Sequence, residues 1–189
     1  MEDKLTLDEK STLLRLAREA VENAVRGQEP PTLDLGNLPT SLRADAASFI
    51  TLTIHGNLRG CIGALEPYQP LAQDVREHAI AAALEDPRFP PVRPEELDKI
   101  EIEVSRLTFP KKLEYTDTTD LLARLRPNVD GVILHDGYRR ATFLPQVWDK
   151  IPDKAEFLDN LCYKMGVPGD TWRHKHLEVL IYQVEEFHE

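Results

Sequence analysis

Two pairs of turn-linked β-strands constrain the fold of this chain more than any other feature. In the first pair, residues 47–55 alternate apolar with polar or aromatic positions, and Gly56–Asn57 offers a turn into a second strand at 58–65. The second pair spans residues 131–144 and turns at Asp136–Gly137. Strands joined by such short turns are antiparallel, which favours an α+β fold over a doubly wound parallel sheet.

Helices and single strands are predicted around both hairpins. A capping box formed by Thr6 and Glu9 opens the first helix. Helices are predicted at 7–26, from Pro70 to Asp86, near 118–125 and at 153–165, and strands at 100–105 and 177–184. The order helix, hairpin, helix, strand therefore occurs twice. We predict a single domain over residues 1–189, with antiparallel or mixed sheets, packed helices, an internal duplication of this unit and a subdomain boundary near 110–117.

Composition limits the partners and the compartment. With 41% hydrophobic residues the chain can bury a sizeable core, and its formal charge of -10 disfavours tracking of nucleic-acid phosphates. The first residues show neither a secretory leader nor an apolar segment of membrane-spanning length, so we expect a cytoplasmic protein without membrane contact. Cys61 and Cys162 are far apart and lack CxxC spacing, which predicts reduced thiols and no structural metal site.

The segment Leu58–Gly63 is the strongest candidate site. In an extended strand Arg59 and Cys61 lie on the same face, where a guanidinium would stabilise a thiolate. Gly60 and Gly63 would let a ligand approach the backbone closely. This pattern is typical of a nucleophile or a small-anion site. The alternative is a buried cysteine in a strand whose glycines accommodate a packed neighbour.

Other residues could complete the site. Asp86 and Arg88 mark a helix stop in which the carboxylate accepts backbone or Arg88 hydrogen bonds, although a binding role stays open. Glu103 could serve as an acid or base, or be simply solvated. His78 and His55 are candidate bases for Cys61. Cys162 shares an apolar helical stripe with leucines and methionine and is predicted to be a core residue.

The motifs together resemble the AMMECR family, the system protein A type of the AmmeMemoRadiSam grouping. The resemblance covers essentially the whole chain. It rests on Leu58-Arg59-Gly60-Cys61-Ile62-Gly63, Asp86-Pro87-Arg88-Phe89-Pro90-Pro91, Glu101-Ile102-Glu103-Val104-Ser105, Asp130-Gly131 and Ala141-Thr142-Phe143-Leu144-Pro145-Gln146-Val147-Trp148. It implies a two-part α+β fold, a site around the cysteine motif, and company with a Memo-like protein and a radical S-adenosylmethionine protein. It implies no particular reaction.

Two functions follow from the candidate residues. The first is a module that binds a small ligand or a partner through Arg59, Gly60, Gly63, Asp86, Arg88 and Glu103. The second is a cysteine-dependent enzyme in which Cys61 is nucleophile or redox thiol and Arg59 stabilises the thiolate or a substrate anion. The sequence contains no phosphate-binding loop, dinucleotide-binding glycine pattern or iron–sulfur spacing, so cofactor and oligomeric state are left undetermined.

Overall fold

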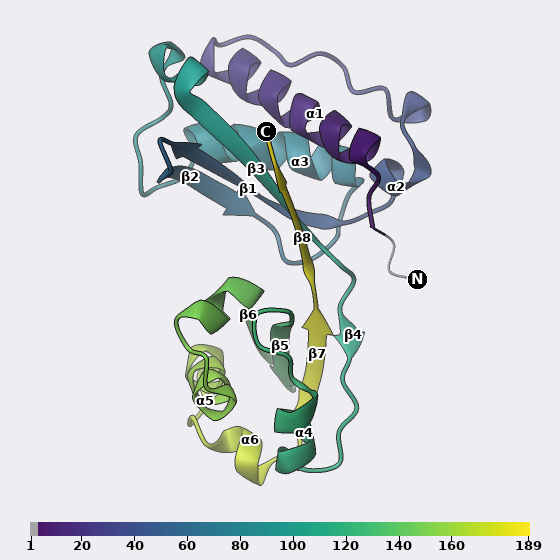
Figure 1. Cartoon of the computed structure of the whole chain (residues 1–189), viewed down its shortest axis with the longest axis vertical. Coiled ribbons are helices and arrows are strands. Elements are labelled where there is room, and N and C mark those ends of the chain that lie inside the picture. The colour runs from purple at the N-terminus through teal and green to yellow at the C-terminus, as the bar shows by residue number, and fades with distance from the viewer. Residues whose placement is uncertain (1–3) are drawn as a thin grey trace. The chain divides into compact units, whose positions relative to one another are not determined.

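A computed structural model describes residues 4–189 (Figure 1). The contacts between residues divide the chain into two units. The first extends to Leu107 and takes in Glu185–Glu189, and the second is Thr108–Val184. Each unit has its own hydrophobic core, built around Leu13, Ile50 and Ile102 in the first and around Trp148, Phe157 and Leu134 in the second.

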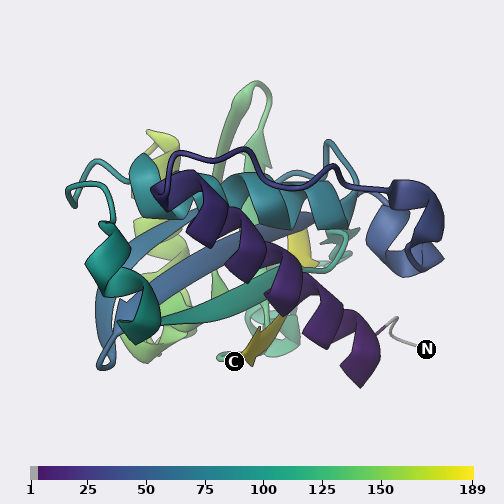
Figure 2. The ribbon, with the colours of Figure 1, turned by 90° about the horizontal axis from the view of Figure 1, so that it is seen from above.

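The first unit is a four-stranded sheet with two long helices on one face. Its strands are β1 (Ala47–Ile54), β2 (Asn57–Gly63), β3 (Ile100–Leu107) and β8 (Val184–His188), in the order β2-β1-β3-β8. Its helices are α1 (Leu7–Val25), α3 (Leu71–Leu84), the short α2 (Thr40–Arg43) and the 3-10 turns η1 (Leu35–Asn37) and η2 (Pro94–Lys99). Figure 2 shows α1 and α3 lying across the strands.

The second unit is also a four-stranded sheet with helices packed on it. Its strands are β4 (Lys111–Lys112), β5 (Gly131–Asp136), β6 (Arg139–Phe143) and β7 (Glu178–Tyr182), in the order β4-β7-β5-β6. Its helices are α4 (Thr118–Arg124), α5 (Lys154–Met165), α6 (Thr171–His174) and the 3-10 turn η3 (Pro145–Asp149). The hairpins and the strands that follow them are antiparallel in both units. The predicted α+β class is confirmed.

Local signals set most element ends. The capping box forms as predicted, because Thr6 accepts a hydrogen bond from the Glu9 backbone and Glu9 accepts one from the Thr6 backbone. Helix α5 ends at Gly166, which adopts a left-handed conformation. None of the helices within residues 4–189 is long and apolar enough to cross a membrane.

Both hairpin turns lie one position from where the sequence placed them. The loop of the first hairpin is His55–Gly56, not Gly56–Asn57, and both residues have positive φ. The loop of the second is Gly137–Tyr138, with φ of 60° at Gly137. Two-residue hairpin loops need positive φ at one or both positions because only that twist matches the flanking strands.

The strand predicted at 177–184 is confirmed as β7, and a further strand, β8, follows it. The structure divides the segment after Leu177 into β7, in the second sheet, and β8, beside β3 in the first. Phe187 of β8 is buried in the core of the first unit. Glu185 accepts a hydrogen bond from the Leu5 backbone and pairs with Lys10. These contacts, all distant in sequence, are the reason that a local reading misses β8.

Candidate functional site

The close approach of β2 to α3 decides which way the cysteine points. A Cβ atom at Gly60 would lie 2.1 Å from the backbone oxygen of Ala82 in α3, so only glycine fits there. Gly63 is similarly close to the next strand, since its Cβ would lie 2.3 Å from the Ser48 backbone oxygen. Because side chains alternate along a strand, Cys61 lies on the sheet face turned away from α3.

Cys61 belongs to a row of polar side chains that crosses three strands. Cys61 is paired with Thr51 of β1, and Thr51 is paired with Glu103 of β3. The Thr51 hydroxyl donates a hydrogen bond to the Cys61 Sγ at 3.5 Å. All three residues are half-buried. The row therefore presents a thiol, a hydroxyl and a carboxylate side by side.

The backbone of Cys61 is held by the loop after α3. The Cys61 N–H donates to Asp86 Oδ2 at 2.8 Å, and Arg88 Nη2 donates to the Cys61 carbonyl at 3.2 Å. Arg88 also donates two side-chain hydrogen bonds to Asp86, at 2.9 and 2.7 Å. Since β2 is the outermost strand of its sheet, this ion pair satisfies the strand edge where no further strand pairs. The predicted Asp86–Arg88 hydrogen bonds are confirmed.

The charge of this pair is fixed at neutral pH. Hydrogen bonds from Arg88, and then those from the backbone of Cys61 and of Arg88, hold the pKa of Asp86 far below its usual value, although burial opposes the shift. The side-chain hydrogen bonds to Asp86, together with the charge of that carboxylate, raise the pKa of Arg88, although burial opposes the shift. A permanent guanidinium therefore lies at the cysteine, and it comes from Arg88.

Strict alternation along β2 would place Arg59 on the same face as Cys61, but the structure gives Arg59 a different neighbour. Its guanidinium donates two hydrogen bonds to Glu96 of η2, at 2.8 and 3.1 Å, and this lowers the pKa of Glu96 to about 2. The register of the β1–β2 pair also shifts between Leu52 and Thr53, opposite Arg59. A bulge of this kind re-aims a side chain. The structure thus places Arg59 in an ion pair with η2.

Glu103 provides the carboxylate of the row. Burial raises the pKa of its carboxyl, the Glu186 carboxylate raises it further, and His188 has a smaller opposing effect. Both of these neighbours are on β8, next to β3. Within residues 4–189 the structure shows neither a hydrogen bond nor an ion pair to the Glu103 side chain.

The candidate bases lie apart from this row. His78 Nδ1 is 3.1 Å from Asp74 Oδ2, and the Ser48 hydroxyl donates to the same oxygen at 2.6 Å, which forms a buried cluster under α3. His55 is a hairpin-loop residue. Cys162 is fully buried in the second core, and burial raises the pKa of its thiol, as a core role predicts. In the described part of the chain no group of three His, Cys, Asp or Glu side chains could hold a metal.

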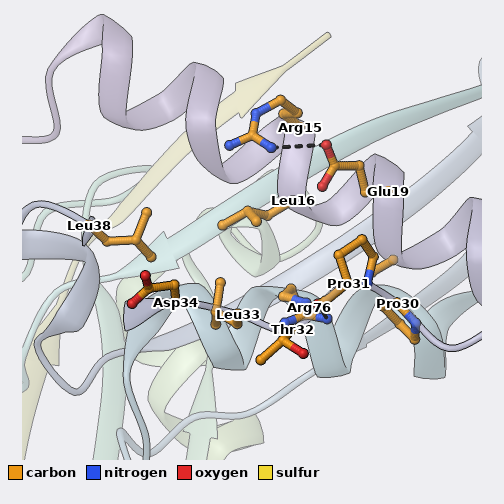
Figure 3. A pocket seen from close by; sticks show the side chains of 11 residues that line it. Arg15, Leu16, Glu19, Pro30, Pro31, Thr32, Leu33, Asp34, Leu38 and Arg76 are labelled. Carbon is orange, nitrogen blue, oxygen red and sulfur yellow. Dashed lines mark hydrogen bonds and ion pairs between the residues drawn. The ribbon is translucent and has the colours of Figure 1, made fainter. Parts of the chain in front are cut away.

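A second concave region lies elsewhere on the first unit. A groove of about 230 Å³ is bounded by α1, the segment 30–38 and Arg76 of α3 (Figure 3). Arg15 pairs with Glu19 across one wall at 2.9 Å, and Arg76 donates to the Pro31 carbonyl at 2.7 Å. These contacts tie the proline-rich segment to the helices. None of the residues that line the groove belongs to the cysteine motif.

The sequence did not indicate two of the residues that this geometry makes prominent. Thr51 joins the row only through strand pairing, and Glu96 meets Arg59 across 37 positions. Counting from the hairpin loop, with the loop placed at His55–Gly56, would have predicted only the two pairs of β1 and β2 that lie next to the loop. It would not have predicted the bulge.

Fold and site together define a two-unit α+β protein with a thiol, a hydroxyl and a carboxylate aligned on one sheet face. The AMMECR1 family profile matches residues 14–187, and the chain belongs to this family. The chain is 44% identical to a protein of Methanothermobacter thermautotrophicus, over 98% of this chain and 96% of the relative. It is 40% identical to protein MK0488 of Methanopyrus kandleri, over 100% and 92%.

A solved structure has the same fold. The uncharacterized protein PH0010 from Pyrococcus horikoshii superposes with a TM-score of 0.81 and is 33% identical, over 98% of this chain and 93% of that one. The family and the fold that the sequence motifs predicted are therefore confirmed. None of these relatives is named for an activity.

Proposed function

We propose that this protein is a binding module whose site is the row Cys61–Thr51–Glu103, and that it acts with a Memo-like protein and a radical S-adenosylmethionine protein. The observation that carries this proposal is the way Cys61 is held. The Cys61 backbone is fixed by Asp86 and Arg88 at its edge, and its thiol accepts a hydrogen bond from Thr51. A rigid strand with a half-exposed polar row is suited to recognition.

Two contacts favour binding over nucleophilic catalysis. A base within hydrogen-bond reach is one common way to activate a cysteine nucleophile, and His78 is instead bonded to Asp74 in a buried cluster. Asp86, a further carboxylate near the thiol, is committed to Arg88 and to the Cys61 N–H. Neither group is placed to take a proton from Cys61.

One observation favours the enzyme as the second candidate. The Arg88 guanidinium donates a hydrogen bond to the Cys61 carbonyl at 3.2 Å, so a fixed cation lies next to this residue. A nearby fixed cation favours the thiolate form of a cysteine. If this effect dominates, Cys61 is a fast-reacting thiol, and the two candidates therefore differ in a measurable rate.

The test compares the alkylation rates of the two cysteines by peptide mass spectrometry. Iodoacetamide is added to the protein alone, and to the protein mixed with the purified Memo-like or radical S-adenosylmethionine protein of the same organism. The module predicts slow alkylation of Cys61 that a partner slows further, and none of buried Cys162 in the folded state. Thr51→Val removes the hydroxyl that donates to Sγ and should slow the reaction at Cys61, because a hydrogen bond to the sulfur favours the reactive thiolate. Fast alkylation of the wild type without protection by either partner would contradict the module.

A further inference from the structure

The first sheet has one face that its own helices leave uncovered. Leu52, Ile102 and Phe187 point into the core under α1 and α3, so their neighbours in sequence point the other way. We call this other side the open face and define it by Phe49, Thr51, Thr53, Cys61, Glu101, Glu103, Glu186 and His188. Of these, Glu101, Glu186 and His188 are exposed, and the others are half-buried.

The open face contains a carboxylate that is not paired with a lysine or arginine in the described part of the chain. Glu103 is half-buried between Thr51 of β1 and the strand β8. A charge removed from water is costly unless another charge or hydrogen bond compensates it. The chain compensates Asp86 with Arg88 and Glu96 with Arg59, but within the described residues it supplies nothing equivalent at Glu103.

The charge of the chain is concentrated on the unit that bears this face. Thr108–Val184 contain eleven Lys or Arg and eleven Asp or Glu residues, so the second unit is neutral. The first unit has twelve basic and twenty-two acidic residues and therefore carries the whole formal charge of -10. A field of this sign attracts cations and basic surfaces and repels acidic ones.

We propose that the open face binds a basic segment of a partner protein, with a lysine or arginine head group at Glu103. This rests on the proposed function and specifies the partner's chemistry. The cation compensates Glu103, and the exposed Glu101 adds favourable charge on the same face. The apolar stem of a long basic side chain lies along Phe49 and the Thr51 methyl group, as such stems do on mixed surfaces. Its neighbour on the row is the Cys61 thiol.

The test uses a defined probe and a matched pair of variants. The probe is an eight-residue peptide of alternating lysine and glycine, and the control is the same peptide with every lysine side chain acetylated. Binding is followed by backbone amide shifts in NMR and by protection of Cys61 from iodoacetamide. Glu103→Gln removes the charge with little change of shape. Glu95→Gln removes the same charge from η2, where Glu95 is largely exposed.

We expect the lysine peptide to shift the amides of Thr51, Cys61 and Glu103 and to slow alkylation of Cys61. Acetylation should abolish both effects. Glu103→Gln should weaken binding roughly tenfold, because about 1.4 kcal/mol of charge interaction corresponds to that factor. Glu95→Gln should change it less than about twofold, as is typical of an exposed charge.

Three results would overturn the inference. The first is equal weakening by both variants, which would mean that the peptide follows only the general field. The second is binding of the acetylated peptide, and the third is shifts outside the open face. A different result would contradict the proposed function itself, namely that neither whole partner protein protects Cys61 from iodoacetamide. Protection by a partner that is unchanged in Glu103→Gln would leave the module standing and refute the basic segment.

Discussion

The two units share the same order of helices and strands and differ in the side chains that their sheets carry. Each has a hairpin followed by a helix and a third strand, with strand orders β2-β1-β3 and β6-β5-β7. Across the first sheet, the face away from the helices carries the row Cys61, Thr51 and Glu103. The matching row in the second sheet is Thr142, Ile133 and Leu180. The shared plan therefore explains the fold, and the side chains of one unit explain the candidate site.

The largest effect should come from the contact of β2 with α3. Gly60→Ala places a methyl group 2.1 Å from the Ala82 carbonyl, so strand and helix must separate, and we expect a loss of about 3 kcal/mol. The matched change in the second unit is Gly137→Ala, where no atom lies within 4 Å and only the positive φ is strained, at about 1 kcal/mol. Urea unfolding measures both. Equal losses would mean that β2 does not depend on this close approach.

The next effect should come from the ion pair at the edge of β2. Asp86→Asn weakens the acceptor of the Cys61 N–H and of Arg88, at a cost of about 2 kcal/mol. Asp159→Asn, in a more exposed pair with Arg173, should cost less than about 1 kcal/mol.

The pH dependence of the same variant checks its cause. The folded-state pKa of Asp86 is lowered, so its contribution is present above the usual value of 3.8 and is lost as the pH falls through the lower folded value. The difference in unfolding free energy between wild type and Asp86→Asn should shrink in that acid window. A difference that is constant down to acid denaturation would exclude charge as its cause.

The two cysteines should separate stability from binding. Cys162→Ala removes a fully buried sulfur from the second core, and we expect a loss of about 1 kcal/mol with partner binding intact. Cys61→Ala should cost less than about 0.5 kcal/mol, because this side chain is only half-buried, yet it should weaken partner binding. Thermal unfolding and co-purification measure the two effects. A loss of binding in Cys162→Ala at normal stability would contradict the assignment.

The smallest expected effect is a gain in folding stability when Glu103 is neutralised. The folded-state pKa of Glu103 is raised, so the folded state disfavours the carboxylate, and the stability present at acid pH is lost as the pH rises through that folded value. Glu103→Gln should therefore be slightly more stable than wild type at neutral pH, and the advantage should fade below the usual value of 4.5. A destabilised variant at neutral pH would show that Glu103 has a compensating partner.

Elements and hairpins with local signals could be predicted from the sequence, and pairings between distant strands could not. The capping box of α1 and the Gly166 end of α5 depend on a few adjacent residues, which the sequence displays. β8 depends on Phe187 reaching a core assembled by residues far upstream. For the same reason Cys61 could be singled out from its motif, whereas its contacts with Thr51, Asp86 and Arg88 could not be predicted in full. The bulge opposite Arg59 has no local sequence signal that distinguishes it from a regular strand.

The position of β8 has a consequence for biosynthesis. The ribosome delivers β3 and β8 with the entire second unit between them, so the sheet of the first unit cannot be completed when its first three strands have been made. The second unit is contiguous, and vectorial synthesis lets it fold before the sheet that precedes it is finished. Until β8 arrives, the outer edge of β3 stays unpaired, which is the condition in which a nascent chain is most open to aggregation or to a chaperone.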